Sequence, residues 1–113
     1  MHLKHSNNMT KEKQRIAIAE ACGWKWHSRI KGSIKVWDNG LDYVFYDSDL
    51  PDYLNDLNAM HEAEKTLDGM NQLTYLAKLH EGNHYCSWGG TCATAAQRAE
   101  AFLKTIDKWE YTL

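Results

Sequence analysis

Hydrophobic residues recur at helical spacing near both ends of the chain. In TKEKQRIAIAEAC (10–22), Ile16 and Ala19 fall on one face. Thr10 has the side chain of a helix N-cap, and Gly23 is a natural helix end because glycine tolerates the left-handed conformation. The pattern therefore predicts a first helix over 10–22.

The strongest helix signal lies over 94–106. Thr94 and Gln97 have the spacing of a capping box, in which each side chain bonds a backbone N–H that the helix start leaves unpaired. Apolar residues then recur at i, i+3, i+4 and i+7, namely Ala99, Phe102, Leu103 and Ile106.

Two β-rich runs, SIKVW (33–37) and LDYVFY (41–46), flank Asp38-Asn39-Gly40. Asn-Gly supplies the positive φ values that a tight hairpin turn requires, so a β-hairpin is predicted here. The run HYCSWGGT (84–91) is compatible with a short third strand.

Two further helices are predicted in the middle of the chain. The first begins near Asp49 as N-cap, with Pro51 in its first turn, and ends at Asp68-Gly69. Its apolar stripe consists of Leu50, Tyr53, Leu54, Leu57, Met60 and Leu67. The second covers 71–80 and ends at Gly82-Asn83, with Leu73, Leu76 and Ala77 expected to point inward.

A small sheet has two faces, and four amphipathic helices each need to bury a stripe. Covering both faces of the sheet is the economical arrangement. We therefore predict an α+β domain: a three-layer α/β/α sandwich over 10–113, with about three strands including a hairpin and about four helices. Residues 1–9 are expected to be a flexible N-terminus.

Composition excludes several classes of protein. The 113 residues fit one domain, and 43% hydrophobic with 12% aromatic residues indicate a globular chain rather than a disordered one. A net charge of -2 argues against a protein that coats nucleic acid. There is no apolar run of membrane-spanning length and no signal-like core in MHLKHSNNMT, so we expect no membrane contact and a cytoplasmic location, where thiols stay reduced.

Three segments in order are similar to one known family: IAEACGWKW (18–26), LPDYLNDLNAMHEAEKTL (50–67) and ATAAQRAEAFLKTIDKW (93–109). Together, over somewhat under half of the chain, they resemble the phage ABA sandwich domain family. Its members are small phage and prophage proteins named for an α/β/α layered fold. The resemblance implies that fold and a phage origin. It implies no reaction, and no functional residue is carried over.

The stretch HEGNHYCSWGGTC (80–92) contains residue types that bind zinc, namely His80, His84, Cys86 and Cys92. Cys86 and Cys92 are separated by five residues, and no C-x-x-C occurs, so the spacing does not match the common zinc knuckles. We favour a structural turn without metal or cofactor, and zinc stays open as an alternative. A Cys86–Cys92 disulfide is not expected in a reducing compartment.

No catalytic motif is recognisable. His61-Glu62 begins an H-E-x-x-H pattern, but Lys65 stands where the second histidine is needed. Glu62 and Glu64 are therefore predicted to be solvated. A nucleophile pair of Cys86 and His84 stays open, although no activating group is visible. We predict that the protein is not an enzyme.

The first charged cluster is basic. In a strand, Lys25, His27, Arg29 and Lys31 share one face at a period of two. Such a face suits phosphate or an acidic partner, or it is the polar outside of an edge strand, where lysines discourage aggregation. The predicted basic strip consists of Trp24, Lys25, Trp26, His27, Arg29, Lys31 and Lys35.

The second charged cluster is acidic. Nine acids and one cation, Lys65, occur between Asp38 and Asp68. The predicted acidic face consists of Asp47, Asp49, Asp52 and Asp56. It either imitates a phosphate backbone or complements the positive end of a helix dipole.

These features predict a small accessory phage protein that binds and inhibits a host protein. The concrete version is an anti-CRISPR-like inhibitor of a host defence component. A nucleotide-binding sponge, with Trp24 or Trp26 stacking on a base, and a domain without any catalytic role are the alternatives. Under the first hypothesis, charge reversal at Lys25, Arg29 and Lys31, or at Asp52 and Asp56, abolishes binding and leaves folding intact.

Overall fold

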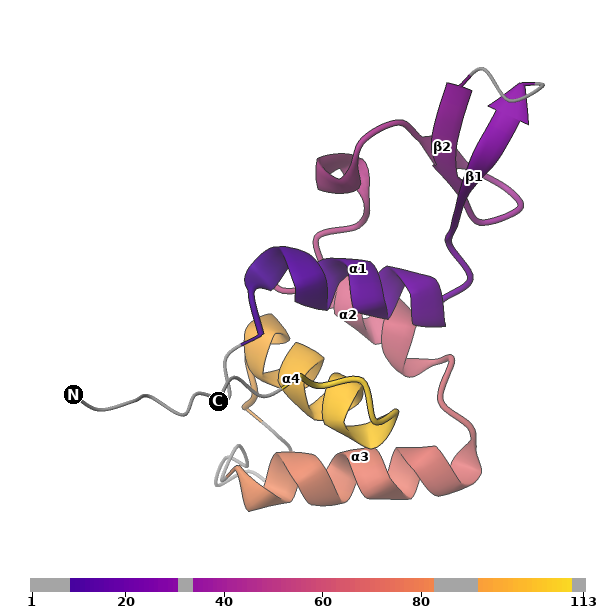
Figure 1. The fold of residues 1–113 in the computed structure, drawn as a ribbon. Helices are drawn as coiled ribbons and strands as arrows, with labels where there is room; N and C mark the ends of the chain where they lie inside the picture. Colours follow the sequence, from indigo (N-terminus) through magenta and orange to yellow (C-terminus); the bar gives the residue numbers. More distant parts are fainter. Residues whose placement is uncertain (1–8, 31–33, 83–91, 111–113) are drawn as a thin grey trace.

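The computed structural model describes residues 9–30, 34–82 and 92–110, without the side chains of 28–30 and 34 (Figure 1). The elements in chain order are α1 (Lys11–Ala21), β1 (Lys25–Ile30), β2 (Ile34–Asp38), β3 (Tyr43–Val44), the 3₁₀ turn η1 (Asp47–Asp49), α2 (Leu57–Glu64), α3 (Gly69–Glu81) and α4 (Ala95–Thr105). Four helices and a three-stranded antiparallel sheet in this part of the chain confirm the predicted α+β class.

The first and last helices form as predicted. Thr10 Oγ1 accepts a hydrogen bond from the Lys13 backbone N–H at 3.2 Å, and Gly23 follows α1 at a φ of 102°. At α4, the Thr94 hydroxyl accepts from the Gln97 N–H at 3.1 Å. The Gln97 side chain accepts from the Thr94 N–H at 2.8 Å, so the capping box is confirmed.

Met9 departs from the prediction of a flexible N-terminus over 1–9. Its side chain is buried, and its carbonyl accepts a hydrogen bond from Gln14 Nε2 at 2.9 Å. The buried glutamine and the methionine together anchor the chain ahead of α1.

The predicted hairpin exists, with a wider turn. β2 and β3 are joined by 39–42, where Gly40 has a φ of 96°. Asn39 Oδ1 accepts from the backbone N–H groups of Leu41 and Asp42 at 2.9 and 2.7 Å, which stabilises the turn from its own side chain. The third strand is β1, antiparallel to β2, and the strand predicted at 84–91 lies outside the described residues.

The strand register defines two faces, because directly paired residues point the same way. Trp26 pairs with Trp37, and Trp37 with Val44. Trp37 belongs to the hydrophobic core and the partly buried Val44 packs against it, so we call this side the core face. Lys25, Asp38 and Tyr43 are paired across the other side, which we call the outer face although it also includes Val36, paired with His27 and buried.

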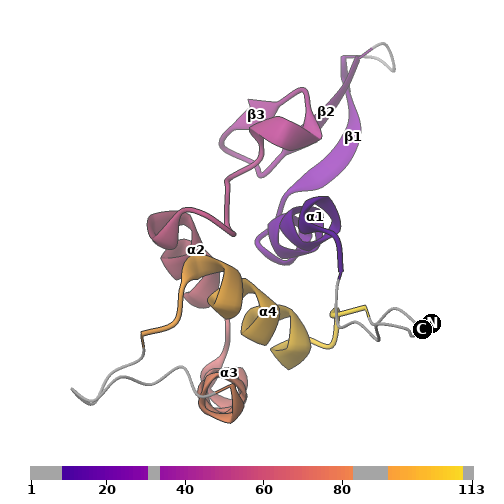
Figure 2. The ribbon, with the colours of Figure 1, turned by 90° about the vertical axis from the view of Figure 1, so that its left-hand side faces the viewer.

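The predicted sandwich layering is not confirmed. The sheet lies at one end of the molecule, α1 and α4 follow below it, and α3 lies at the opposite end (Figures 1 and 2). α4 contacts α1, α2 and α3, and its Ala99, Phe102 and Leu103 are fully buried. A sheet whose third strand has two residues is too narrow to cover four helices, so the helices bury their stripes mainly against one another.

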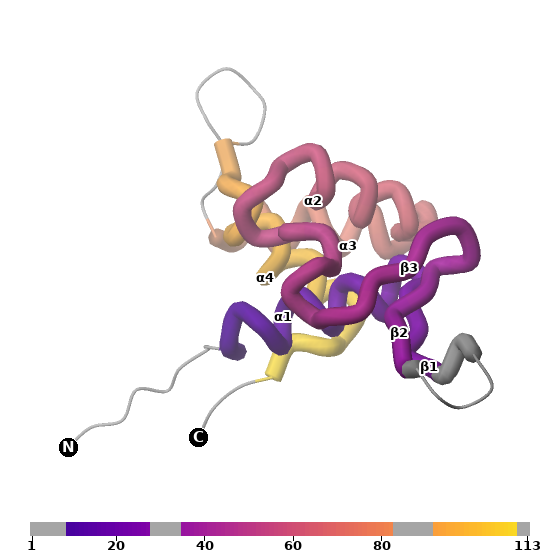
Figure 3. Tube along the Cα trace, turned by 90° about the horizontal axis from the view of Figure 1, so that it is seen from above, coloured from indigo at the N-terminus to yellow at the C-terminus, as the bar shows by residue number. Residues whose placement is uncertain are grey.

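The second helix starts later than predicted. Asp56, not Asp49, is its N-cap, and its carboxylate accepts from the Asn58 N–H at 2.9 Å. Asp49 belongs to η1, and the connection from β3 to α2 runs back from the sheet toward the helices (Figure 3). Backbone bonds from Asn55 and Asp56 to the Asp52 carbonyl form a local turn instead of a helix start.

The end of α2 and the inward face of α3 also differ from the prediction. Asp68 caps α3 by accepting from the Asn71 N–H at 2.8 Å, so Asp68-Gly69 begins a helix rather than ending one. The residues that α3 buries are Tyr75 and Leu79. The residues predicted to point inward, Leu73, Leu76 and Ala77, are exposed. α3 has two apolar stripes, and the stripe that faces α4 is buried.

The position of the α2 start is testable by comparing two aspartates. We expect Asp56→Ala to lower the free energy of unfolding by about 1 kcal/mol, because an N-cap is lost. Asp49→Ala, in an exposed position of η1, is expected to change it by less than about 0.5 kcal/mol. Urea unfolding followed by circular dichroism measures both, and a larger loss for Asp49→Ala would contradict the observed helix start.

Candidate functional site

The predicted basic strip is divided between environments. Trp24 is buried in the core, whereas Trp26 is 46% exposed, with its ring centroid 5.5 Å from that of Trp37. Lys25 and His27 are exposed on the outer face, but Lys35 pairs with Ser28 and so points to the opposite side. Lys31 and the side chain of Arg29 lie outside the described residues.

An acid lies between Lys25 and His27 on the outer face. Asp38 is paired with Lys25 across the strands, and its carboxylate oxygen lies 3.5 Å from His27 Nε2. The described part of the strip is therefore a surface of mixed charge, which is a poor match for a phosphate chain.

Most of the predicted acidic face has structural partners. Asp47 accepts a hydrogen bond from the Trp37 indole N–H at 2.6 Å, and Asp52 lies 3.1 Å from the Arg15 guanidinium. Asp56 caps α2. These four acids do not lie on one helix, because η1 ends at Asp49 and α2 begins only at Leu57. They therefore do not form a helix face. Charge reversal at Asp52 or Asp56 would remove an ion pair or a helix cap together with a surface charge, so a loss of binding in these variants would not by itself place the two acids in an interface.

A cluster of exposed aromatic side chains follows β2, and the sequence analysis missed it. Tyr43, Phe45 and Tyr46 are 49%, 48% and 68% exposed. The rings of Tyr43 and Phe45 meet edge to face with centroids 5.5 Å apart. We define the aromatic–acidic surface as Asp42, Tyr43, Phe45, Tyr46 and Asp49. LDYVFY was predicted as one strand of the hairpin, but strand pairing ends at Val44, so Phe45 and Tyr46 lie beyond the sheet.

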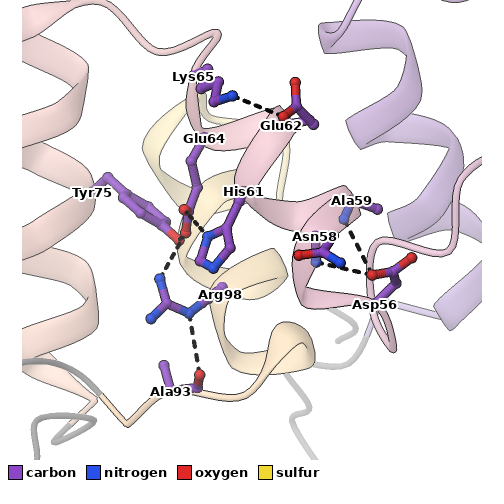
Figure 4. Close-up of polar contacts among 10 residues, drawn as sticks. All are labelled: Asp56, Asn58, Ala59, His61, Glu62, Glu64, Lys65, Tyr75, Ala93 and Arg98. Carbon is purple, nitrogen blue, oxygen red and sulfur yellow. Dashed lines mark hydrogen bonds and ion pairs between the residues drawn. The ribbon is translucent and has the colours of Figure 1, made fainter.

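The second unanticipated feature is a polar cluster that joins three helices (Figure 4). Glu64 of α2 accepts hydrogen bonds from Tyr75 of α3 and from Arg98 of α4, the latter at 2.9 Å. His61 Nδ1 lies 2.8 Å from the second Glu64 oxygen. Arg98 Nε also donates to the Ala93 carbonyl at 3.2 Å, which fixes the start of α4.

Glu64 was predicted to be solvated, and this is wrong: only 18% of its side chain is exposed. Glu62 is exposed and pairs with Lys65 at 2.8 Å, as expected of a surface acid. The position of Glu64 in the helix could have indicated its partial burial. Glu64 stands one turn after Met60 and beside Ala63, and α2 buries both of these residues.

The cluster shifts the pKa values of its members. Burial raises the pKa of Glu64, but hydrogen bonds from Tyr75, His61 and Arg98 outweigh it and hold the pKa below the usual value. Burial and the neighbouring carboxylate raise the pKa of Tyr75. Partial burial lowers the pKa of Arg98, yet Glu64 more than compensates and raises it. At neutral pH the cluster is a charged Glu–Arg pair with a protonated tyrosine, which suits a structural clamp.

The described residues give no support to metal or thiol chemistry. Within them, no three His, Cys, Asp or Glu side chains gather closely enough to hold a metal ion. Two of the four candidate zinc ligands, His80 and Cys92, are exposed. The other two, His84 and Cys86, lie outside the described residues. Burial raises the pKa of the Cys22 thiol, which disfavours the reactive thiolate.

A comparison with known protein families, curated proteins and solved structures finds no match to this chain. The resemblance to the phage ABA sandwich family therefore stays a prediction. In the described part of the chain, no helix combines the length and apolarity needed to cross a membrane.

The polar cluster predicts a pH-dependent contribution to stability. We expect Glu64→Gln to lower the free energy of unfolding at pH 7 by about 2 kcal/mol, because it removes the charged partner of Arg98. The folded pKa of Glu64 is lowered, so its contribution is present above the unfolded pKa of about 4.3 and is lost as the pH falls through the folded value. Urea unfolding of wild type and Glu64→Gln, from pH 7 to below the folded pKa of Glu64, measures this effect. The difference between their free energies of unfolding should become smaller as the pH falls.

Glu62→Gln is the matched control, since it changes a surface acid of the same helix. Its expected effect is less than about 0.5 kcal/mol. Equal losses for the two variants, or a Glu64→Gln deficit that does not change with pH, would contradict the assigned role of the cluster.

Proposed function

We propose that this protein binds another protein through its aromatic–acidic surface and thereby blocks that protein's function. The observation that carries the proposal is that Tyr43, Phe45 and Tyr46, close together in the sequence, are each about half exposed or more, and that the rings of Tyr43 and Phe45 are in contact. Single exposed apolar residues are ordinary, but aromatic side chains that gather on the surface are typical of binding hot spots.

The charges around these rings favour a basic partner. Of the described residues, none forms a hydrogen bond or ion pair with the Asp42 or Asp49 carboxylate, and the sequence has no lysine or arginine from 36 to 64. Arginine side chains suit this surface best, because a guanidinium can stack on an aromatic ring and bond a carboxylate with two N–H groups.

A basic surface rich in arginine is typical of proteins that bind nucleic acid. The proposed partner is therefore a nucleic-acid-binding host protein whose basic surface is occupied in competition with its ligand. The resemblance to a phage family favours a component of host defence, such as a CRISPR effector. In this proposal acidic side chains still imitate the phosphates of a nucleic acid. The acids that do so belong to the aromatic–acidic surface within 42–49, in place of the predicted acidic face.

The nucleotide sponge is supported less well. Trp24 is buried, so of the two tryptophans proposed to stack on a base only Trp26 is accessible. The acid Asp38 is paired with Lys25 and lies 3.5 Å from His27, and its charge opposes a phosphate group.

The test compares wild-type protein with two variants of the surface in a bacterial host. The first variant replaces Tyr43, Phe45 and Tyr46 with Ala, and the second carries Asp42→Asn and Asp49→Asn. Proteins that co-purify are identified by native mass spectrometry, and their affinities are measured. We expect the aromatic variant to weaken binding by at least about 30-fold, because hot-spot truncations cost about 2 kcal/mol or more. The aspartate variant should weaken it less and reduce its salt dependence.

Glu12→Gln with Glu20→Gln, on the exposed side of α1, is the control for the aspartate variant, since it removes the same charge elsewhere. Unchanged far-ultraviolet circular dichroism shows that each variant is folded. The proposal is wrong if wild type and the aromatic variant bind the same partner equally well. A nucleotide-sized excess mass without a protein partner would favour the sponge instead.

A further inference from the structure

A cavity of about 430 Å³ lies between the turn of the sheet and α2. Its volume falls within the range of small-ligand sites, roughly 300–1,000 Å³. It is lined by Trp24, which follows α1, by Asp42, in the turn before β3, and by Glu62, on α2. Three segments that are far apart in the sequence therefore converge on one hollow.

The buried part of the lining is apolar and fixed in place. Trp24, Tyr53 and Ala63 line the cavity and are buried, so they form its floor. The backbone N–H of Trp24 donates to the Ala19 carbonyl at 3.0 Å, and that of Tyr53 donates to the Pro51 carbonyl at 3.0 Å. The floor is therefore ordered before any ligand arrives, which lowers the entropy that binding costs.

The exposed part of the lining is acidic. Asp42 and Glu62 are its charged members, and no lysine, arginine or histidine occurs among the described residues that line the cavity. Glu62 is paired with Lys65 at 2.8 Å, whereas no described residue bonds the Asp42 carboxylate. Asn39 Oδ1 accepts from the Asp42 N–H at 2.7 Å, which holds the Asp42 backbone and leaves its carboxylate available. The cavity thus combines a negative rim with an apolar floor.

This combination suits a cation that has an apolar stem. A guanidinium group fits better than an ammonium group, because it is planar and weakly hydrated and its N–H groups can bond a carboxylate in pairs. We propose that the cavity binds an arginine side chain of the partner protein, with the guanidinium bonded to Asp42 and the methylene stem against Trp24 and Tyr53. Asp42 also belongs to the aromatic–acidic surface, so the cavity adjoins the surface through which the partner binds.

This inference rests on the proposed function for the source of the arginine, but its test uses only the purified full chain and synthetic ligands. The two can therefore fail separately. A host protein that co-purifies, together with a cavity that binds no arginine peptide, would contradict the arginine site alone. An arginine peptide that binds in the cavity, without any co-purifying host protein, would contradict the proposed function alone.

The test is a nuclear magnetic resonance titration, which detects weak binding and locates it. The ligands are the capped peptide acetyl-Gly-Arg-Gly-amide, the same peptide with citrulline in place of arginine, and agmatine, a free guanidinium compound. Citrulline has a neutral urea of nearly the same shape. The arginine peptide should shift the amide signals of Trp24 and Ala63. The citrulline peptide should bind at least about 10-fold more weakly, because its hydrogen bond to the carboxylate lacks the second charge.

Variants of the cavity provide the second arm. Asp42→Asn should weaken binding of the arginine peptide by about 10-fold, because it removes the charge that faces the guanidinium. Asp49→Asn is the matched control, since Asp49 belongs to the same surface but is not among the residues that line the cavity. Ala59→Leu places a larger side chain at a half-buried lining position of α2 and should weaken binding to a similar extent. Circular dichroism shows whether each variant is folded.

Three results would each overturn the proposal: equal affinities for the arginine and citrulline peptides, equal effects of Asp42→Asn and Asp49→Asn, or signal shifts confined to residues outside the cavity. Binding of agmatine without binding of the arginine peptide would also overturn it, because the cavity would then receive a free guanidinium compound instead of a protein side chain.

Discussion

The packing of α4 is the constraint on which the rest of the fold depends. Its fully buried residues Ala99, Phe102 and Leu103 bring the other three helices to one core. Small and large side chains alternate on this face, so neighbouring helices can approach closely beside the alanine and interlock around the phenylalanine. Arg98, on the same helix, adds a charged bond to Glu64 where α2, α3 and α4 meet. Apolar burial draws the helices together, and the directional polar bonds fix their relative placement.

Several charged residues in this protein join elements of the fold, which their sequence pattern does not suggest. Trp37 buries its ring on the core face and donates its indole N–H to Asp47, which joins the sheet to η1. Arg15 of α1 bonds the Pro51 carbonyl and the Asp52 carboxylate, which joins the first helix to the connection before α2. The acids of the predicted acidic face therefore do not act as one surface. Asp47 and Asp52 join elements of the fold, and Asp49 belongs to the exposed aromatic–acidic surface.

Sequence reasoning was most successful where local chemistry decides the structure. The hydroxyl of Thr10, the pair Thr94 and Gln97, and the turn at Asn39-Gly40 each satisfy nearby backbone groups, so their effect does not depend on distant partners. It failed where the choice depends on tertiary contacts. Asp49 and Asp56 are equally good caps by type, and both stripes of α3 are apolar. Only the packing against α4 determines which stripe is buried, and only strand pairing determines which aromatics of LDYVFY stay exposed. Glu64 became part of a cluster because residues 11 and 34 positions away meet it.

The contact between α1 and α4 has a consequence for synthesis of the chain. It joins residues near the start of the described chain to residues near its end, so the shared core cannot close until α4 has left the ribosome. Until then the apolar faces of the earlier helices have no final partner, whereas the hairpin can pair as soon as its own strands are available. A nascent chain of this protein is therefore expected to depend on its last helix for cooperative folding, and a chain truncated before α4 would expose an incomplete core to the cell's proteases.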